Sequence, residues 1–326
     1  MTGARQGTRH KAEGRSAERT DAGQLVSLLK KRTSASRFLT CALCLLSSAL
    51  SLAQQQPVFR TSVLGVSVSV SVRKGNAPVQ GLTAADFELT DNGVPQTISA
   101  VSVETLPVDI TLLLDVSRSV EGQRLDRLKS SVLETATLLA RDDRLRLIAM
   151  QHRLREVFAF QPAGARLPVD GLMAQGGTSL VDGLAAAMMR SAEPDRRQLI
   201  VAYTDGMDTM SILQPAVARE IAGFADAVVH VLVPVANPGR TSVQSLPASG
   251  GPFLNELAAR TGGQLFWIGY DAPIGDAFKA AITEFRTSYV LRYLPANVKT
   301  EGWHDIVVRV KGGPYEVRAR KGYSGS

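Results

Sequence analysis

The feature that most restricts how this chain can fold is a regular alternation of apolar runs and amphipathic segments between residues 108 and 286. The run from Ile110 to Leu114 is continuously apolar, as expected of a strand buried on both faces of a parallel sheet. The segment after it carries four apolar residues on one helical face, Leu125, Leu128, Val132 and Leu139. Repeated strand–helix pairs of this kind predict an open, mostly parallel α/β sheet with helices on both faces.

The remaining elements of this region are predicted from the same two periodicities. We expect further strands at residues 145–150, 156–160, 198–204, 227–235 and 264–268, and helices at residues 180–190, 215–224, 253–260 and 277–285. His230 lies in one of the apolar strands without a metal-ligand partner at suitable spacing, and we expect it to be a core residue.

Strand patterns without helices flank the α/β region on both sides. Residues 63–72 alternate strictly between apolar and polar, and Asn92-Gly93 is typical of a hairpin turn between strands at residues 87–90 and 96–103. Three more strands are expected at residues 289–294, 306–310 and 315–320. We expect an N-terminal β unit (54–105) to pair with C-terminal strands (287–326) in a small β-sandwich, beside a domain formed by residues 106–286.

The amino end has the pattern of a targeting segment. Four basic residues between positions 30 and 37 precede an apolar run from Phe38 to Ala53, which is shorter than the roughly 18 residues that span a bilayer. Residues 1–53 are therefore predicted to be an extension and secretory signal, which implies export to the periplasm or the medium of a bacterium. An uncleaved signal anchor is the alternative, and the true start codon is left open. No later apolar segment approaches membrane length.

Charge and cysteine content exclude two other classes. Residues 1–53 hold nine Lys/Arg and three Asp/Glu, so that only +1 of the net charge of +7 belongs to the rest of the chain. A nucleic-acid-binding surface is not indicated. The two cysteines, Cys41 and Cys44, fall inside the predicted signal, where we interpret them as apolar filler rather than a redox or metal site.

Oxygen-bearing side chains follow several of the predicted strands. Asp115, Ser117 and Ser119 come directly after the first buried strand, Thr178 follows two glycines before a helix, and Asp205 ends another strand. Ligands of open α/β sheets bind at this edge, and oxygen-only donors suit a hard divalent cation. The residues predict a site for Mg²⁺, with Mn²⁺ or Ca²⁺ possible.

These three loops resemble the metal-ion-dependent adhesion site (MIDAS) of von Willebrand factor type A (VWFA) domains over about residues 106–290. The flanks "LTAADFELTDNGVPQTI" and "GWHDIVVRVKGGPYEVRARKGY" are similar to secreted VWFA-related proteins of Acidobacteria. The resemblance implies a Rossmann-like α/β fold and metal-mediated protein binding, with the five residues named above as metal ligands, directly or through water. It also implies a protein partner that offers an acidic side chain to the metal.

Simpler structural roles are open to these residues and their neighbours. Ser117, Ser119 and Thr178 are also typical helix-capping residues. Asp182 is expected to lie in the first turn of a helix, where the helix dipole favours a carboxylate. Asp208 is expected to be a solvated loop carboxylate. Arg118 either selects an acidic partner or is an ordinary exposed arginine.

The functional hypothesis from the sequence is an exported, non-enzymatic adhesion-type module that uses a divalent cation. Two alternatives stay open: an envelope scaffold in which the metal only stabilises the loops, and, least favoured, a metal-assisted hydrolase. No nucleophile–base pair or phosphate-binding loop is evident in the sequence. The sequence does not define the oligomeric state.

Overall fold

The computed structural model describes residues 65–325 apart from 76, 104–105, 191–192, 194 and 248–249. The predicted signal, residues 1–53, and its two cysteines lie outside the described residues. Within the described part of the chain, none of the helices combines the length and the apolar character needed to cross a membrane.

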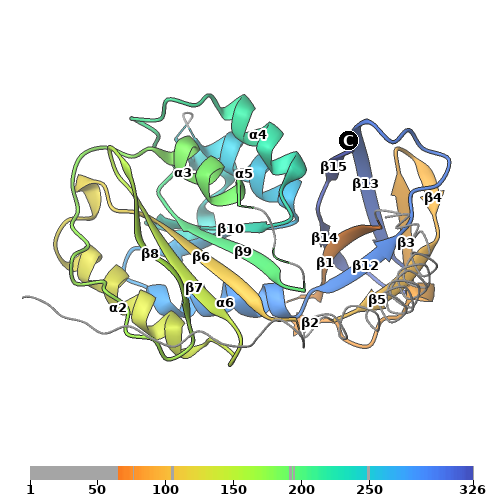
Figure 1. Ribbon diagram of the computed structural model, residues 1–326, viewed down its shortest axis with the longest axis horizontal. Coiled ribbons are helices and arrows are strands. Elements are labelled where there is room, and N and C mark those ends of the chain that lie inside the picture. The colour runs from red at the N-terminus through yellow and green to blue at the C-terminus, as the bar shows by residue number, and fades with distance from the viewer. Residues whose placement is uncertain are drawn as a thin grey trace, which may run out of the picture. The chain divides into compact units, whose positions relative to one another are not determined.

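The centre of the α/β domain is a six-stranded sheet with the strand order β11-β10-β9-β6-β7-β8 (Figure 1). Its strands are β6 (Val108–Asp115), β7 (Arg144–Met150), β8 (Leu154–Pro162), β9 (Arg197–Tyr203), β10 (Val228–Val235) and β11 (Leu265–Gly269). All neighbours are parallel except β7 and β8, which form an antiparallel hairpin. Every position of β6 and β9 is buried, which explains their unbroken apolar character.

Helices cover both faces of this sheet (Figure 1). They are α2 (Gln123–Thr137), α3 (Leu180–Met188), α4 (Pro215–Phe224), α5 (Gly251–Thr261) and α6 (Ile274–Arg286). Helices α2 and α6 share one apolar core with the side chains of Ile110, Leu112 and Leu114, whereas α3, α4 and α5 share the other core with Leu113. Alternate residues of one strand therefore supply both cores, and the predicted α/β fold class is confirmed.

The flanking segments form two antiparallel sheets around a separate apolar core. One has the order β14-β1-β12-β5, with β2 also paired to β1, and the other has the order β15-β13-β3-β4. The strands are β1 (Val66–Lys74), β2 (Ala77–Pro78), β3 (Phe87–Asp91), β4 (Val94–Gln96), β5 (Ile98–Ser102), β12 (Tyr289–Tyr293), β13 (Gly302–Val310), β14 (Glu316–Ala319) and β15 (Gly322–Gly325). Because β1 lies between β12 and β14, both ends of the described chain share one sheet.

Two details of the flanks differ from the sequence prediction. The expected strand at residues 96–103 is two strands, since β4 pairs with β3 in one sheet and β5 pairs with β12 in the other. Strand β15 was not predicted, because its sequence Gly-Tyr-Ser-Gly has little intrinsic strand preference and it forms by pairing with β13. The turn at Asn92-Gly93 is present, and both residues have positive φ, 48° and 78°.

Two buried carboxylates hold polar networks in this region. Asp91 accepts hydrogen bonds from the hydroxyls of Tyr293 (2.9 Å) and Tyr323 (3.2 Å), and its other oxygen lies 2.8 Å from Nδ1 of His304. Glu284, on α6, pairs with Arg73 of β1 and accepts a hydrogen bond from Ser71. The second network links the last helix of the α/β domain directly to the sandwich.

His230 is a buried core residue of β10, as predicted. Its Nδ1 accepts a hydrogen bond from the backbone N–H of Gln264 at 3.1 Å, and its Nε2 is buried without a partner in the described part of the chain. Burial, together with the positive charge of Arg318, lowers the pKa of His230 from 6.5 to about 3. The folded protein therefore holds this imidazole neutral.

We expect His230 to make the protein less stable in mild acid. Below pH 6.5 the unfolded chain binds a proton at His230, whereas the imidazole stays neutral in the folded protein. The free energy of unfolding therefore falls by about 1.4 kcal/mol for each unit by which the pH is lowered. We compare the free energy of unfolding in urea at pH 7 and at pH 5. Between these values the wild type should lose roughly 2 kcal/mol more than His230→Asn, whose Oδ1 can replace Nδ1 as acceptor. Parallel pH dependence of the two proteins would contradict this.

Candidate metal centre

The site lies where two neighbouring parallel strands end. Strands β6 and β9 are paired in register from Val108 to Leu114, so their carboxyl ends lie side by side. The chain leaves β6 towards α2 on one face of the sheet and leaves β9 towards α4 on the other face (Figure 1). Loops that diverge in this way leave a crevice between them, which is the usual ligand position in open α/β sheets.

Asp115 is the innermost acidic group of this crevice. It is the last residue of β6 and only 2% exposed, and its Oδ1 accepts a hydrogen bond from the backbone N–H of Ser117 at 3.0 Å. The hydroxyl of Thr178 lies 3.2 Å from both carboxylate oxygens of Asp115. The structure thus brings together two predicted site residues that are 63 positions apart in the sequence.

The two serines lie beside each other in the loop after β6. Their Oγ atoms are 3.0 Å apart, Ser117 is buried and Ser119 is exposed. Ser117 precedes a short 3-10 turn but makes no side-chain capping hydrogen bond, and α3 is preceded by Ser179 rather than Thr178. Helix capping therefore does not account for the hydroxyls of Ser117 and Thr178.

Asp205 approaches from the end of β9 and is partly exposed. Its Oδ1 accepts a hydrogen bond from the backbone N–H of Met207 at 2.9 Å, which turns the loop immediately after the strand. Its negative charge contributes to the raised pKa of Asp115, so the two carboxylates interact electrostatically. The five predicted residues therefore come from three loops at one edge of the sheet.

Backbone contacts fix the loop that carries Thr178. The N–H of Gln175 donates to the carbonyl of Val116 at 3.0 Å, and the N–H of Arg118 donates to the carbonyl of Gly176 at 3.1 Å. Gly176 has a φ of +68°, and a Cβ at this position would lie 2.8 Å from Nδ1 of His152. A glycine is therefore required where this loop meets the Asp115 loop.

One contributor was missed in the sequence. Thr204 is fully buried, and its hydroxyl donates to Oδ2 of Asp115 at 3.2 Å and accepts the N–H of Gly206 at 3.1 Å. It therefore links the Asp115 carboxylate to the turn around Asp205. Its place next to Asp205, at the end of a buried strand, was the only signal available in the sequence.

The neighbouring acidic residues have local structural contacts. Asp182, in the first turn of α3, accepts hydrogen bonds from the backbone N–H groups of Ile212 (3.0 Å) and Leu213 (2.8 Å). Asp208 accepts one from Ser211 at 3.1 Å. Both carboxylates therefore shape the loop that follows β9. Arg118 is exposed on the Asp115 loop.

The donor set fits a hard divalent cation. Burial raises the pKa of Asp115 above its ordinary value, hydrogen bonds from Ser117 oppose the rise, and the charge of Asp205 adds to it. A cation among these oxygens would offset that unfavourable negative charge. Among the described residues no three His, Cys, Asp or Glu side chains cluster, so a cation here would have two carboxylates and otherwise hydroxyls or water as ligands.

We expect Asp115→Asn to raise the melting temperature of the protein in excess chelator. A carboxyl group whose pKa is raised in the folded state destabilises that state once it is ionised, and Asn removes this charge while keeping the shape. Asp91→Asn is a matched control, because the equally buried Asp91 accepts three hydrogen bonds from tyrosine and histidine and should lose stability. A lower melting temperature for both variants would contradict this account.

Comparison with known proteins places this site in a family context. Residues 109–248 match the model of the von Willebrand factor type A domain. An uncharacterized protein from Synechocystis is 37% identical over 107 residues, which cover 31% of this chain and 26% of the relative. The match thus spans about a quarter of that relative's length.

Solved structures with similar folds have low sequence identity. A von Willebrand factor type A protein from Catenulispora acidiphila is 11% identical with a TM-score of 0.46, covering 82% of this chain and 75% of that one. An aerotolerance-related membrane protein from Bacteroides fragilis is 17% identical with a TM-score of 0.42, covering 55% and 98%. By the family match and the architecture of its sheet and helices, residues 109–248 of this chain form a von Willebrand factor type A domain.

Proposed function

We propose that this chain is an exported, non-enzymatic module that binds a protein partner through a divalent cation, with Mg²⁺ as the first candidate. The observation that carries the proposal is the convergence of Asp115, Ser117, Ser119, Thr178 and Asp205 at the adjoining ends of β6 and β9. Oxygen donors of this kind suit Mg²⁺, and Mn²⁺ and Ca²⁺ are the alternatives.

The five residues would hold the cation directly or through water. Two carboxylates only balance the charge of a divalent ion, and Mg²⁺ takes six oxygen ligands in an octahedral arrangement. When bound, the cation supplies an electrophilic position for one oxygen from outside the chain. An acidic side chain of the partner is the favoured ligand there, because it adds a negative charge as well as an oxygen.

Exposed apolar residues near the site favour a protein as partner. The loop that begins with Asp205 exposes Met207, Met210 and Ile212 by 42%, 47% and 91%. Met173, which precedes the Thr178 loop, is 59% exposed. Methionine adapts its shape to different apolar surfaces, and clustered exposed apolar side chains are typical of protein-binding surfaces.

Titration calorimetry with Mg²⁺ tests the metal site. We expect saturable heat with the wild-type chain and none with Asp115→Ala. Asp208→Asn is the local control, because Asp208 contacts only backbone N–H groups among the described residues and its loss should leave Mg²⁺ binding in place. Equal heats for the wild type and Asp115→Ala would refute the proposal, and loss of binding in both variants would point to local charge rather than ligation.

Capture of a partner from envelope extract separates adhesion from a scaffold role. With Mg²⁺ the wild type should retain a partner that chelator releases and that Asp115→Ala does not retain. If chelator lowers the melting temperature while partner capture is unchanged, the cation stabilises the loops only, and the adhesion proposal is wrong.

A further inference from the structure

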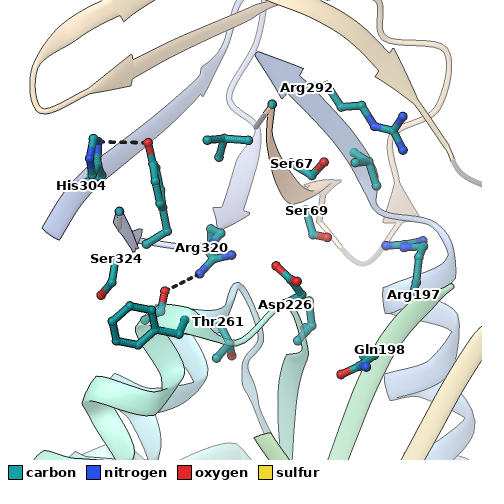
Figure 2. A pocket seen from close by; sticks show the side chains of 18 of the residues that line it. Ser67, Ser69, Arg197, Gln198, Asp226, Thr261, Arg292, His304, Arg320 and Ser324 are labelled. Carbon is teal, nitrogen blue, oxygen red and sulfur yellow. Dashed lines mark hydrogen bonds between the residues drawn. The ribbon is translucent and has the colours of Figure 1, made fainter. Parts of the chain in front are cut away.

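A cavity of about 670 Å³ with polar and apolar lining residues lies between the α/β domain and the β-sandwich (Figure 2). Its walls come from the amino end of β9, the end of α4 and strands β1, β12 and β15. The candidate metal centre is at the carboxyl end of β9, so the two sites occupy opposite edges of the sheet. A volume of this size suits a small organic molecule.

Arg320, which follows β14, is one of two buried arginines among the described residues that line this cavity, the other being Arg197. Arg320 is 8% exposed, and its Nε donates to the carbonyl of Gly322 at 2.9 Å while its Nη2 donates to the carbonyl of Gly223 at 3.4 Å. No carboxylate of the described residues lies within ion-pair distance of Arg320. Its Nη1 donates no hydrogen bond to any of the described residues. Figure 2 shows the guanidinium among Ser67, Asp226 and Ser324.

Two further buried polar atoms of the cavity lining have no partner among the described residues. One is the side-chain amide nitrogen of Gln198, near the start of β9, and the other is Nε2 of His304, on β13. Gln198 is 7% exposed and His304 is 1% exposed. Buried polar atoms are rarely left without hydrogen bonds, so these two side chains have unmet hydrogen-bonding capacity beside the cavity.

The charges nearest the guanidinium of Arg320 favour a ligand with one negative group there. Asp226 is exposed and lies beyond ion-pair distance of Arg320, although its charge reaches the guanidinium. Asp226 would repel a dianion, whereas one carboxylate matches the guanidinium of Arg320. The other buried arginine of the lining, Arg197, already donates hydrogen bonds to Ser288 and Phe285. Burial lowers the pKa of Arg320, consistent with a guanidinium that lacks a close anion.

Apolar side chains complete the wall. Val66, Val228 and Val290 line the cavity, and Phe224, at the end of α4, is 61% exposed at the same place. These groups suit the hydrocarbon part of a ligand rather than a free inorganic ion.

We propose that this cavity binds a small organic acid with one carboxylate, which contacts Nη1 of Arg320 while the hydrocarbon part lies against Val228, Val290 and Phe224. A charge-assisted hydrogen bond from arginine to a carboxylate is strong, and Nη1 is available for it because Nε and Nη2 donate to the carbonyls of Gly322 and Gly223. The ligand would fill the space between the two parts of the chain without contact to the metal centre.

Ligand titrations of the full chain test the proposal, with hexanoate, benzoate and inorganic phosphate as probes. We expect saturable binding of at least one of the two carboxylates, and affinity about tenfold or more lower in Arg320→Gln. Arg309→Gln is the matched control, since Arg309 is an exposed arginine outside the cavity and its loss changes the net charge equally.

Ser69→Phe is the second variant, because it fills the cavity from β1 and leaves Arg320 in place. It should abolish carboxylate binding and keeps the proposal testable if Arg320→Gln does not fold. The proposal is overturned if neither carboxylate binds, if Arg320→Gln or Ser69→Phe binds as tightly as the wild type, or if phosphate binds more tightly than both carboxylates.

Discussion

The parallel pairing of β6 with β9 is the constraint on which the candidate site depends. Both strands are buried along their whole length, so their register is fixed by two apolar cores rather than by the loops. That register brings Asp115 and Asp205, at adjoining strand ends, into electrostatic contact. The hydroxyls of Thr178 and Thr204 then reach the same carboxylate. A buried acidic group is costly in such a place, and the surrounding oxygens make its neutralisation by a cation favourable.

The β-sandwich adds a second level of organisation. Strand β1 pairs with β12 and β14, which follow the α/β domain in the sequence. The sandwich is therefore complete only when strands from both sides of that domain have paired. Glu284 ties α6 to β1 through Arg73 and Ser71. The same arrangement encloses the cavity of Arg320, in which residues from both parts of the chain meet. A domain with a candidate metal site at one edge of its sheet therefore also has a cavity at the other edge.

The sequence was sufficient for the fold class and for the positions of the five candidate ligands, because both follow from local patterns. Apolar runs and helical periodicity define β6 and α2, and strand ends place Asp115 and Asp205. Contacts that depend on tertiary structure were not predictable. Thr204 becomes relevant only through its hydrogen bond to Asp115, and Asp182 only because the loop after β9 folds back onto α3.

The same limit applies to the flanks. Strand β15 exists because β13 offers it a partner, and the break between β4 and β5 reflects a change of sheet. The environment of Arg320 depends on Gly223 and Gly322, which are distant in sequence from each other. No periodicity or motif in the sequence predicts such a long-range contact. A strand buried on both faces, in contrast, can be predicted from its continuous apolar composition.

Anomalous diffraction from crystals of the chain soaked in Mn²⁺ tests the central claim most directly. The account predicts a single strong peak in the crevice, with the oxygens of Asp115, Ser117, Ser119, Thr178 and Asp205 around it as ligands or one water removed. A crevice without a peak at saturating Mn²⁺, or a peak held by other residues, would contradict it.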